Sequence, residues 1–69
     1  MEFKFVLKDL REQKGLSQAE LANIVGVSQG VISQYERGDR KPTNEIHLKL
    51  SKALGVSMDF LMGDKDDIS

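Results

Sequence analysis

The chain has 69 residues, of which 39% are hydrophobic and 30% are charged, and its formal net charge is −1 at pH 7. A chain of this length makes one small domain, near the lower size at which a single core folds without covalent staples. Cysteine is absent, which excludes disulfides and thiolate metal sites, and no apolar stretch approaches the roughly 18 residues of a membrane span. We therefore expect a soluble, cytoplasmic domain with no membrane partner.

The charge is distributed unevenly along the sequence. Residues 1–57 carry nine Lys/Arg and seven Asp/Glu, whereas residues 58–69 carry four aspartates and one lysine. Acidic runs of this kind are usually solvated. We expect residues 1–63 to form the folded domain and residues 64–69 to form a disordered acidic tail. The body is therefore mildly basic, although its cluster of nearby cations would by itself be typical of an ordinary surface: Arg37, Arg40 and Lys41.

Apolar spacing predicts a first helix over about residues 2–14. Phe3, Leu7 and Leu10 recur at i, i+4 and i+7, which places them on one face of a helix. Gly15 follows and favours a left-handed stop at the end of that helix.

The next two helices are each predicted to begin at a serine. Ser17 and Glu20 have the spacing of a capping box, in which the serine accepts a backbone N–H and the glutamate reaches back. The helix that follows is expected to end at Gly26, with a buried face of Leu21, Ala22 and Val25. Ser28 is the natural N-cap of a third helix, predicted over residues 28–37.

A turn and a fourth helix come next. Pro42 disfavours helix in the residue before it, so residues 39–42 are predicted to form a turn. Thr43 then caps a helix that ends at Gly55, and its apolar stripe contains Ile46, Leu50, Ala53 and Leu54.

Ser57 is expected to cap a short last helix over residues 58–62, which Gly63 would stop. Leu61 is expected to point inward, while three neighbours could belong either to the core or to a dimer surface: Met58, Phe60 and Met62. No β-type alternation persists for more than a few residues. The predicted fold class is therefore all-α, as one compact domain of five helices.

The third predicted helix has a polar front and an apolar back. At about 100° per residue, Ile32 and Tyr35 fall opposite Gln29. The front contains Gln29, Gly30, Ser33, Gln34 and Arg37. Glutamine can pair bidentately with adenine, and serine can donate to or accept from bases or phosphates. Such a front suits a helix that enters the DNA major groove, although a simple solvated face would be an equally good explanation of this helix alone.

The preceding helix favours the first explanation. Residues 18–37 meet the steric demands of a helix-turn-helix, because Ala22 is small where two helices would cross and Gly26 can adopt the positive φ of a tight turn. The apolar positions that would hold the two helices at their angle are Leu21, Val25, Val27, Ile32 and Tyr35. All these features at these spacings are improbable by chance.

On these residues the chain resembles the Xre family, the helix-turn-helix domain of lambdoid phage repressors and Cro proteins. The resemblance covers about residues 3–62, and its marks are LKDLREQKGLSQAELA, VGVSQGVISQYERGDRKP and LSKALGVSMDFL. It implies a five-helix, lambda-repressor-like fold. It also implies a sequence-specific DNA-binding transcription regulator, expected to be a repressor, that binds a palindromic double-stranded operator as a homodimer.

The resemblance further implies roles for individual residues. Gln29 corresponds to the principal base reader, and Gln18 to the residue that holds a phosphate and braces that reader. Gly30 departs from relatives that carry a side chain there, so it would contribute close approach, while Ser33 and Gln34 complete the reading face. The expected phosphate contacts are Ser17, Gln18, Ser28, Arg37, Arg40 and Lys41.

Arg11 and Glu36 match a pair that forms a structural salt bridge beneath the DNA-binding surface in this family. Two alternatives to DNA binding stay open. One is a helical protein-interaction module, antitoxin-like or adaptor-like, on the same scaffold. The other is an enzyme, which we do not expect because no nucleophile elbow or phosphate loop is present. With His47 as the only histidine, we expect no metal site and no cofactor.

Overall fold

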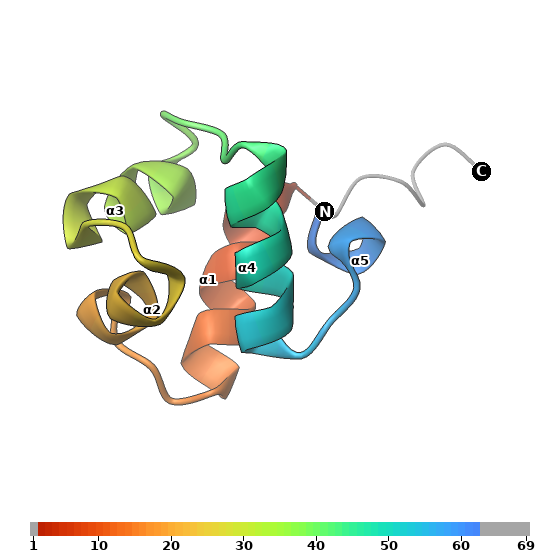
Figure 1. Cartoon of the computed structure of the whole chain (residues 1–69), viewed down its shortest axis with the longest axis horizontal. Helices are drawn as coiled ribbons and strands as arrows, with labels where there is room; N and C mark the ends of the chain where they lie inside the picture. The colour runs from red at the N-terminus through yellow and green to blue at the C-terminus, as the bar shows by residue number, and fades with distance from the viewer. Residues whose placement is uncertain (1, 63–69) are drawn as a thin grey trace.

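The computed structural model describes residues 2–62 as five α-helices joined by short loops (Figure 1). The helices are α1 (Phe3–Gln13), α2 (Gln18–Val25), α3 (Gln29–Arg37), α4 (Asn44–Leu54) and α5 (Met58–Met62). The all-α prediction is therefore confirmed, and each helix begins and ends within a residue or two of its expected bounds. The predicted stop at Gly63 and the acidic segment 64–69 lie outside the described residues.

Side-chain capping explains why the helices begin where they do. The Ser17 hydroxyl accepts from the Glu20 backbone N–H, and the Glu20 carboxylate accepts from the Ser17 N–H in return, which completes the predicted capping box. Ser28 and Thr43 accept from the third residue beyond them in the same way, as does Ser57 before α5. Such caps satisfy N–H groups that have no partner within the helix.

Gly26 ends α2 and opens the turn into α3. Its φ of +86° lies in the left-handed region, which costs a residue with a Cβ free energy. Its N–H and that of Val27 both donate to the Ala22 carbonyl, at 2.8 and 3.0 Å. The turn is therefore as short as the sequence pattern requires, and α2 packs directly on α3.

The core lies where α2 and α3 meet the remaining helices. Helix α1 packs on α3 and α5, and α4 packs on α2 and α5. Along the long axis of the molecule, α3 and α5 lie at opposite ends (Figure 1). The buried apolar side chains come from every helix: Val6, Leu7, Leu21, Ala22, Val25, Ile32, Tyr35, Leu50, Leu54 and Leu61.

The buried face of α1 differs slightly from the predicted one. Val6, Leu7 and Arg11 are buried, whereas Phe3 and Leu10 are only half-buried. The side chain of Phe3 extends to the edge of the core, where its ring stands at a steep angle to His47, with the ring centroids 5.5 Å apart. The core is therefore centred one residue away from the simple i, i+4, i+7 stripe.

His47 is buried on α4, with 6% of its surface exposed, and its Nε2 has no hydrogen-bond partner among residues 2–62. Burial lowers the pKa of His47 below its ordinary value, because the imidazolium form loses its hydration. Within the same range, no cluster of three or more His, Asp or Glu could hold a metal ion.

Candidate nucleic-acid interface

The front of α3 is an open surface carried on a buried back. Ile32 and Tyr35 anchor the helix in the core, as the helical spacing predicts. On the opposite side Gln29, Gly30 and Arg37 are exposed, and Ser33 and Gln34 are half-buried. The structure thus brings all five predicted front residues onto one accessible face.

Several of these polar side chains are hydrogen-bonded to one another. The Arg37 guanidinium donates to the Ser33 hydroxyl at 2.7 Å and to the Asp39 carboxylate at 2.9 Å. Arg40 donates from Nη1 to the Gln34 amide oxygen at 3.2 Å. The residues that the sequence assigns to bases and those it assigns to phosphates are therefore linked, and Asp39 is a member of this surface that sequence reasoning missed.

A second hydrogen-bonded group lies beneath α3. Arg11 donates to both carboxylate oxygens of Glu36, from Nε at 2.6 Å and from Nη2 at 3.2 Å, and donates from Nη1 to the Leu16 carbonyl at 2.7 Å. Only 10% of the Arg11 side chain and 5% of the Glu36 side chain is exposed. These bonds to Glu36 raise the pKa of Arg11 above its ordinary value, because they stabilise the charged guanidinium.

Gln18 joins this group in place of the arrangement that the resemblance implies. Its amide nitrogen donates to Glu36 at 3.0 Å. Among residues 2–62 it forms no hydrogen bond to Gln29, the residue it was expected to brace. A carboxylate is the stronger acceptor, because a hydrogen bond to a charged group is roughly twice as strong as one between neutral groups. In this structure Gln18 therefore ties the start of α2 to the end of α3.

The predicted phosphate contacts surround the front of α3. Ser17 and Ser28 precede the N-termini of α2 and α3, where free N–H groups and the helix dipole favour anions. Their hydroxyl oxygens accept the capping bonds, which leaves each O–H group able to donate. Arg40 and Lys41 are exposed in the segment that follows α3.

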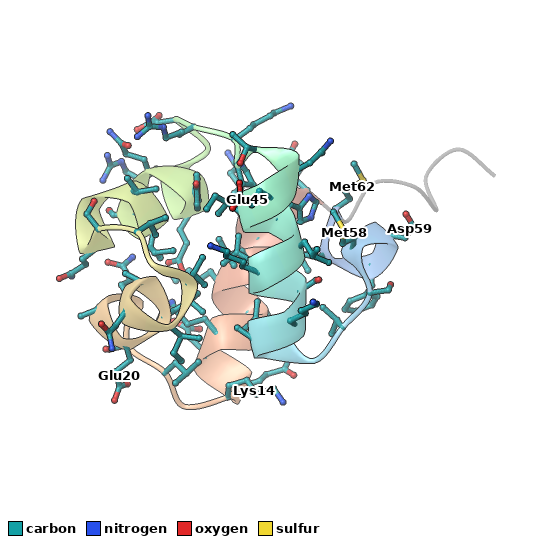
Figure 2. The ribbon with its side chains drawn as sticks, viewed as in Figure 1. Lys14, Glu20, Glu45, Met58, Asp59 and Met62 are labelled. Atoms are coloured by element: carbon teal, nitrogen blue, oxygen red, sulfur yellow. The ribbon has the colours of Figure 1, made fainter. Side chains whose placement is uncertain are left out.

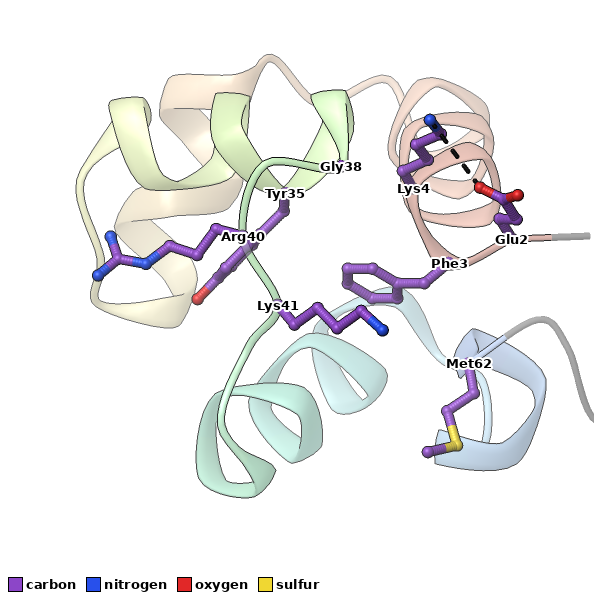
Figure 3. A pocket seen from close by; sticks show the side chains of 8 residues that line it. All are labelled: Glu2, Phe3, Lys4, Tyr35, Gly38, Arg40, Lys41 and Met62. Atoms are coloured by element: carbon purple, nitrogen blue, oxygen red, sulfur yellow. Dashed lines mark ion pairs between the residues drawn. The ribbon is translucent and has the colours of Figure 1, made fainter.

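A third cation, Lys4, borders the same region and was not singled out by the sequence. It comes from α1 and lines, together with Arg40, Lys41, Tyr35 and others, an open pocket of about 220 Å³ (Figure 3). The aliphatic stem of Lys4 lies against Gly38, where a Cβ would come within 2.9 Å of its Cδ. No local sequence signal could place Lys4 there, because the contact joins residues that are far apart in the chain.

The candidate dimer residues lie on α5, at the other end of the molecule. Leu61 is fully buried, as expected, while Phe60 and Met62 are 58% and 44% exposed. Met58 is half-buried, and Figure 2 shows it on the same short helix as Met62 and Asp59. None of the helices within residues 2–62 is both long and apolar enough to cross a membrane.

Known proteins share this sequence and fold. The helix-turn-helix family model matches residues 7–61. Repressor protein C2 of Salmonella phage P22 is 46% identical over 59 residues, covering 86% of this chain and 26% of its own length. The HTH-type transcriptional regulator ImmR of Bacillus subtilis is 40% identical over 63 residues, covering 91% of this chain and 49% of its own length. The chain thus spans about half or less of the length of these relatives.

Solved structures agree with the sequence matches. The P22 c2 repressor in complex with a synthetic operator superposes with a TM-score of 0.88 at 38% identity, over 91% of this chain and 96% of that one. The restriction-modification controller protein C.AhdI of Aeromonas hydrophila gives 0.81 at 37% identity, over 86% and 89%. The fold is therefore the five-helix, lambda-repressor-like one, and the chain belongs to the Xre-like helix-turn-helix family of phage repressors and transcriptional regulators.

Proposed function

We propose that this domain is a sequence-specific DNA-binding transcription regulator, acting as a repressor, with α3 in the major groove. The observation that carries the proposal is the front of α3, where Gln29, Ser33 and Gln34 are accessible on a helix whose back is locked in the core. A glutamine and a hydroxyl are suited to the hydrogen-bonding edges of bases in that groove. The similarity to a repressor determined with its operator supports this assignment.

Phosphate contacts would position the domain on the duplex without reading sequence. Arg37, Arg40 and Lys41 supply the charge beside α3, and Ser17 and Ser28 supply hydroxyls at the helix N-termini. Gly30 would allow the helix backbone to approach the bases closely. The proposed action is binding alone, with no catalytic step, metal or cofactor, and it takes place in the cytoplasm, where prokaryotic DNA lies.

The number of reading side chains favours a homodimer on a palindromic operator. If each good base contact discriminates by about 1–3 kcal/mol, three side chains supply only modest specificity. Two copies on half-sites about 34 Å apart would double the readout. The exposed apolar residues of α5, Phe60 and Met62 with Met58 beside them, are the surface we assign to the contact between copies.

Selection from a random duplex library followed by titration at two salt concentrations tests the proposal. We expect a palindromic motif that Gln29→Ala no longer enriches, while its residual binding keeps the same salt dependence. Lys41→Ala serves as the matched control, because losing a phosphate contact should weaken all sequences alike and reduce the salt slope by about one. A library without an enriched motif would contradict the proposal.

A protein-interaction module is the second candidate function. It is supported by the exposed Phe60 and by the SinR protein/SinI protein complex, whose matching chain is 31% identical with a TM-score of 0.82, over 100% of this chain and 67% of that one. This function predicts that Gln29→Ala and Gln34→Ala are silent, whereas Phe60→Ser abolishes activity. The DNA-binding function predicts loss of operator binding in both glutamine variants.

A further inference from the structure

The two outer glutamines of α3 are in different hydrogen-bonding states. The Gln34 amide oxygen already accepts from Arg40 Nη1, at 3.2 Å. The two N–H bonds of its amide nitrogen remain to face a ligand. A second donor approaching the same oxygen would also approach the guanidinium charge, which disfavours the amino group of adenine or cytosine. Gln34 is therefore oriented as a donor.

Ser33 is biased in the same direction. Its hydroxyl oxygen accepts from Arg37 Nη1 at 2.7 Å, a short bond from a charged donor. A hydroxyl that accepts a charge-assisted bond is polarised, so its own O–H becomes a better donor and its oxygen a poorer acceptor. Asp39 holds the same guanidinium through Nε at 2.9 Å, which fixes the guanidinium beside Ser33.

Gln29 is in the opposite state. It is the first residue of α3 and is exposed, and within residues 2–62 its side-chain amide forms no hydrogen bond. Its oxygen and nitrogen are both available, which is the requirement for bidentate pairing with N6 and N7 of adenine. The reading face thus has a mixed donor–acceptor end at Gln29 and a donor end at Ser33 and Gln34.

Resting on the proposed function, we infer that Arg40 and Arg37 set the hydrogen-bond polarity with which Gln34 and Ser33 read DNA. The donor end selects a base edge made of acceptors, and guanine, with N7 and O6, is the purine that presents only acceptors in the major groove. Gln29 selects adenine. Five residues of helix rise about 7.5 Å, so the two purines are separated by about two base-pair steps.

Arg40 is a positioning residue in this account, because it acts on the base through Gln34. Its remaining N–H groups point away from the Gln34 contact and can still hold a phosphate. Lys41 is the matched comparison: it follows Arg40 directly and carries the same charge, but forms no hydrogen bond to Gln34 in the structure. The two cations should therefore contribute similarly to affinity and differently to base choice.

The test uses the 69-residue chain and duplexes taken from the library selection. Gln34→Ala first identifies the base pair whose preference depends on Gln34. At that pair, the ratio of dissociation constants for adenine and guanine is measured for the wild type, Arg40→Met and Lys41→Met. We expect the wild type to prefer guanine by about fivefold or more, the size of one good base contact. Arg40→Met should reduce this preference to below about twofold, because the freed amide can pair with adenine.

Lys41→Met should weaken binding to both duplexes while preserving their ratio. The inference is overturned if the wild type prefers adenine at that pair, if Arg40→Met keeps the guanine preference, or if both variants change the ratio equally. Failure of the underlying function gives a different result, because no sequence would be enriched in the first selection. That result would overturn the proposed function and this inference together.

Discussion

Replacing Glu36 by leucine should destabilise the domain more than any change at its exposed surface. Glu36 accepts three hydrogen bonds, two from Arg11 and one from Gln18, and its side chain is 5% exposed. Glu36→Leu leaves the Arg11 guanidinium buried without its carboxylate. Arg11 keeps its bond to the Leu16 carbonyl and a 3.9 Å contact with Glu12, so part of its charge remains compensated.

The expected loss follows from that geometry. Removing one partner of a buried ion pair costs about 3–5 kcal/mol, and the remaining Arg11 contacts place this case at about 3 kcal/mol. For a domain of this size the total free energy of unfolding is roughly 3–10 kcal/mol. The melting temperature should therefore fall by about 12–24 °C, since each kcal/mol corresponds to about 4–8 °C in a small domain.

Urea and thermal unfolding followed by circular dichroism measure this loss. A double-mutant cycle with Arg11→Met separates the pair from the burial of its members. The double variant Arg11→Met/Glu36→Leu should recover to within about 1 kcal/mol of the wild type, because two apolar side chains replace two buried charges. A loss below about 1 kcal/mol in Glu36→Leu would refute the reasoning, since that is the value of a solvated surface pair.

Three further changes test other parts of the structure. Gly30→Ala should stabilise the fold by about 0.5–1 kcal/mol, because a Cβ there would meet only the Ser28 hydroxyl at 3.8 Å, whereas Gly26→Ala should cost about 1–2 kcal/mol at its φ of +86°; equal unfolding midpoints would contradict this. Because the pKa of His47 is lowered in the folded state, the unfolded chain takes up the proton first as the pH falls through 6.5, and stability is lost below that pH; unfolding measured from pH 7.5 to 5 should show this slope, reduced in His47→Leu. Asp39→Asn releases Arg37, so DNA titrations should give higher affinity and a salt slope steeper by about one; an unchanged slope would exclude it.

Much of the fold could be predicted because its signals are local. Ser17, Ser28 and Thr43 mark helix starts within three residues of the N–H groups they cap, and Gly26 marks a turn through its own backbone. The 3.6-residue period assigns Ile32 and the other core residues of α3 to one face without knowledge of their partners. The front of α3 follows from the same period, which is why the candidate reading residues could be named in advance.

The long-range contacts depend on the tertiary structure. Bringing α1 beneath α3 decides that Arg11 is buried against Glu36, and the carboxylate then draws Gln18 away from the role the resemblance implied. Burial of His47 beside Phe3 likewise depends on how α4 meets α1. Sequence alone determined which side chains face outward on α3, because helical periodicity is a property of neighbours in the chain. Which of them arrive with an acceptor already occupied was decided only by the fold, because Arg40 reaches Gln34 from the loop beyond the helix.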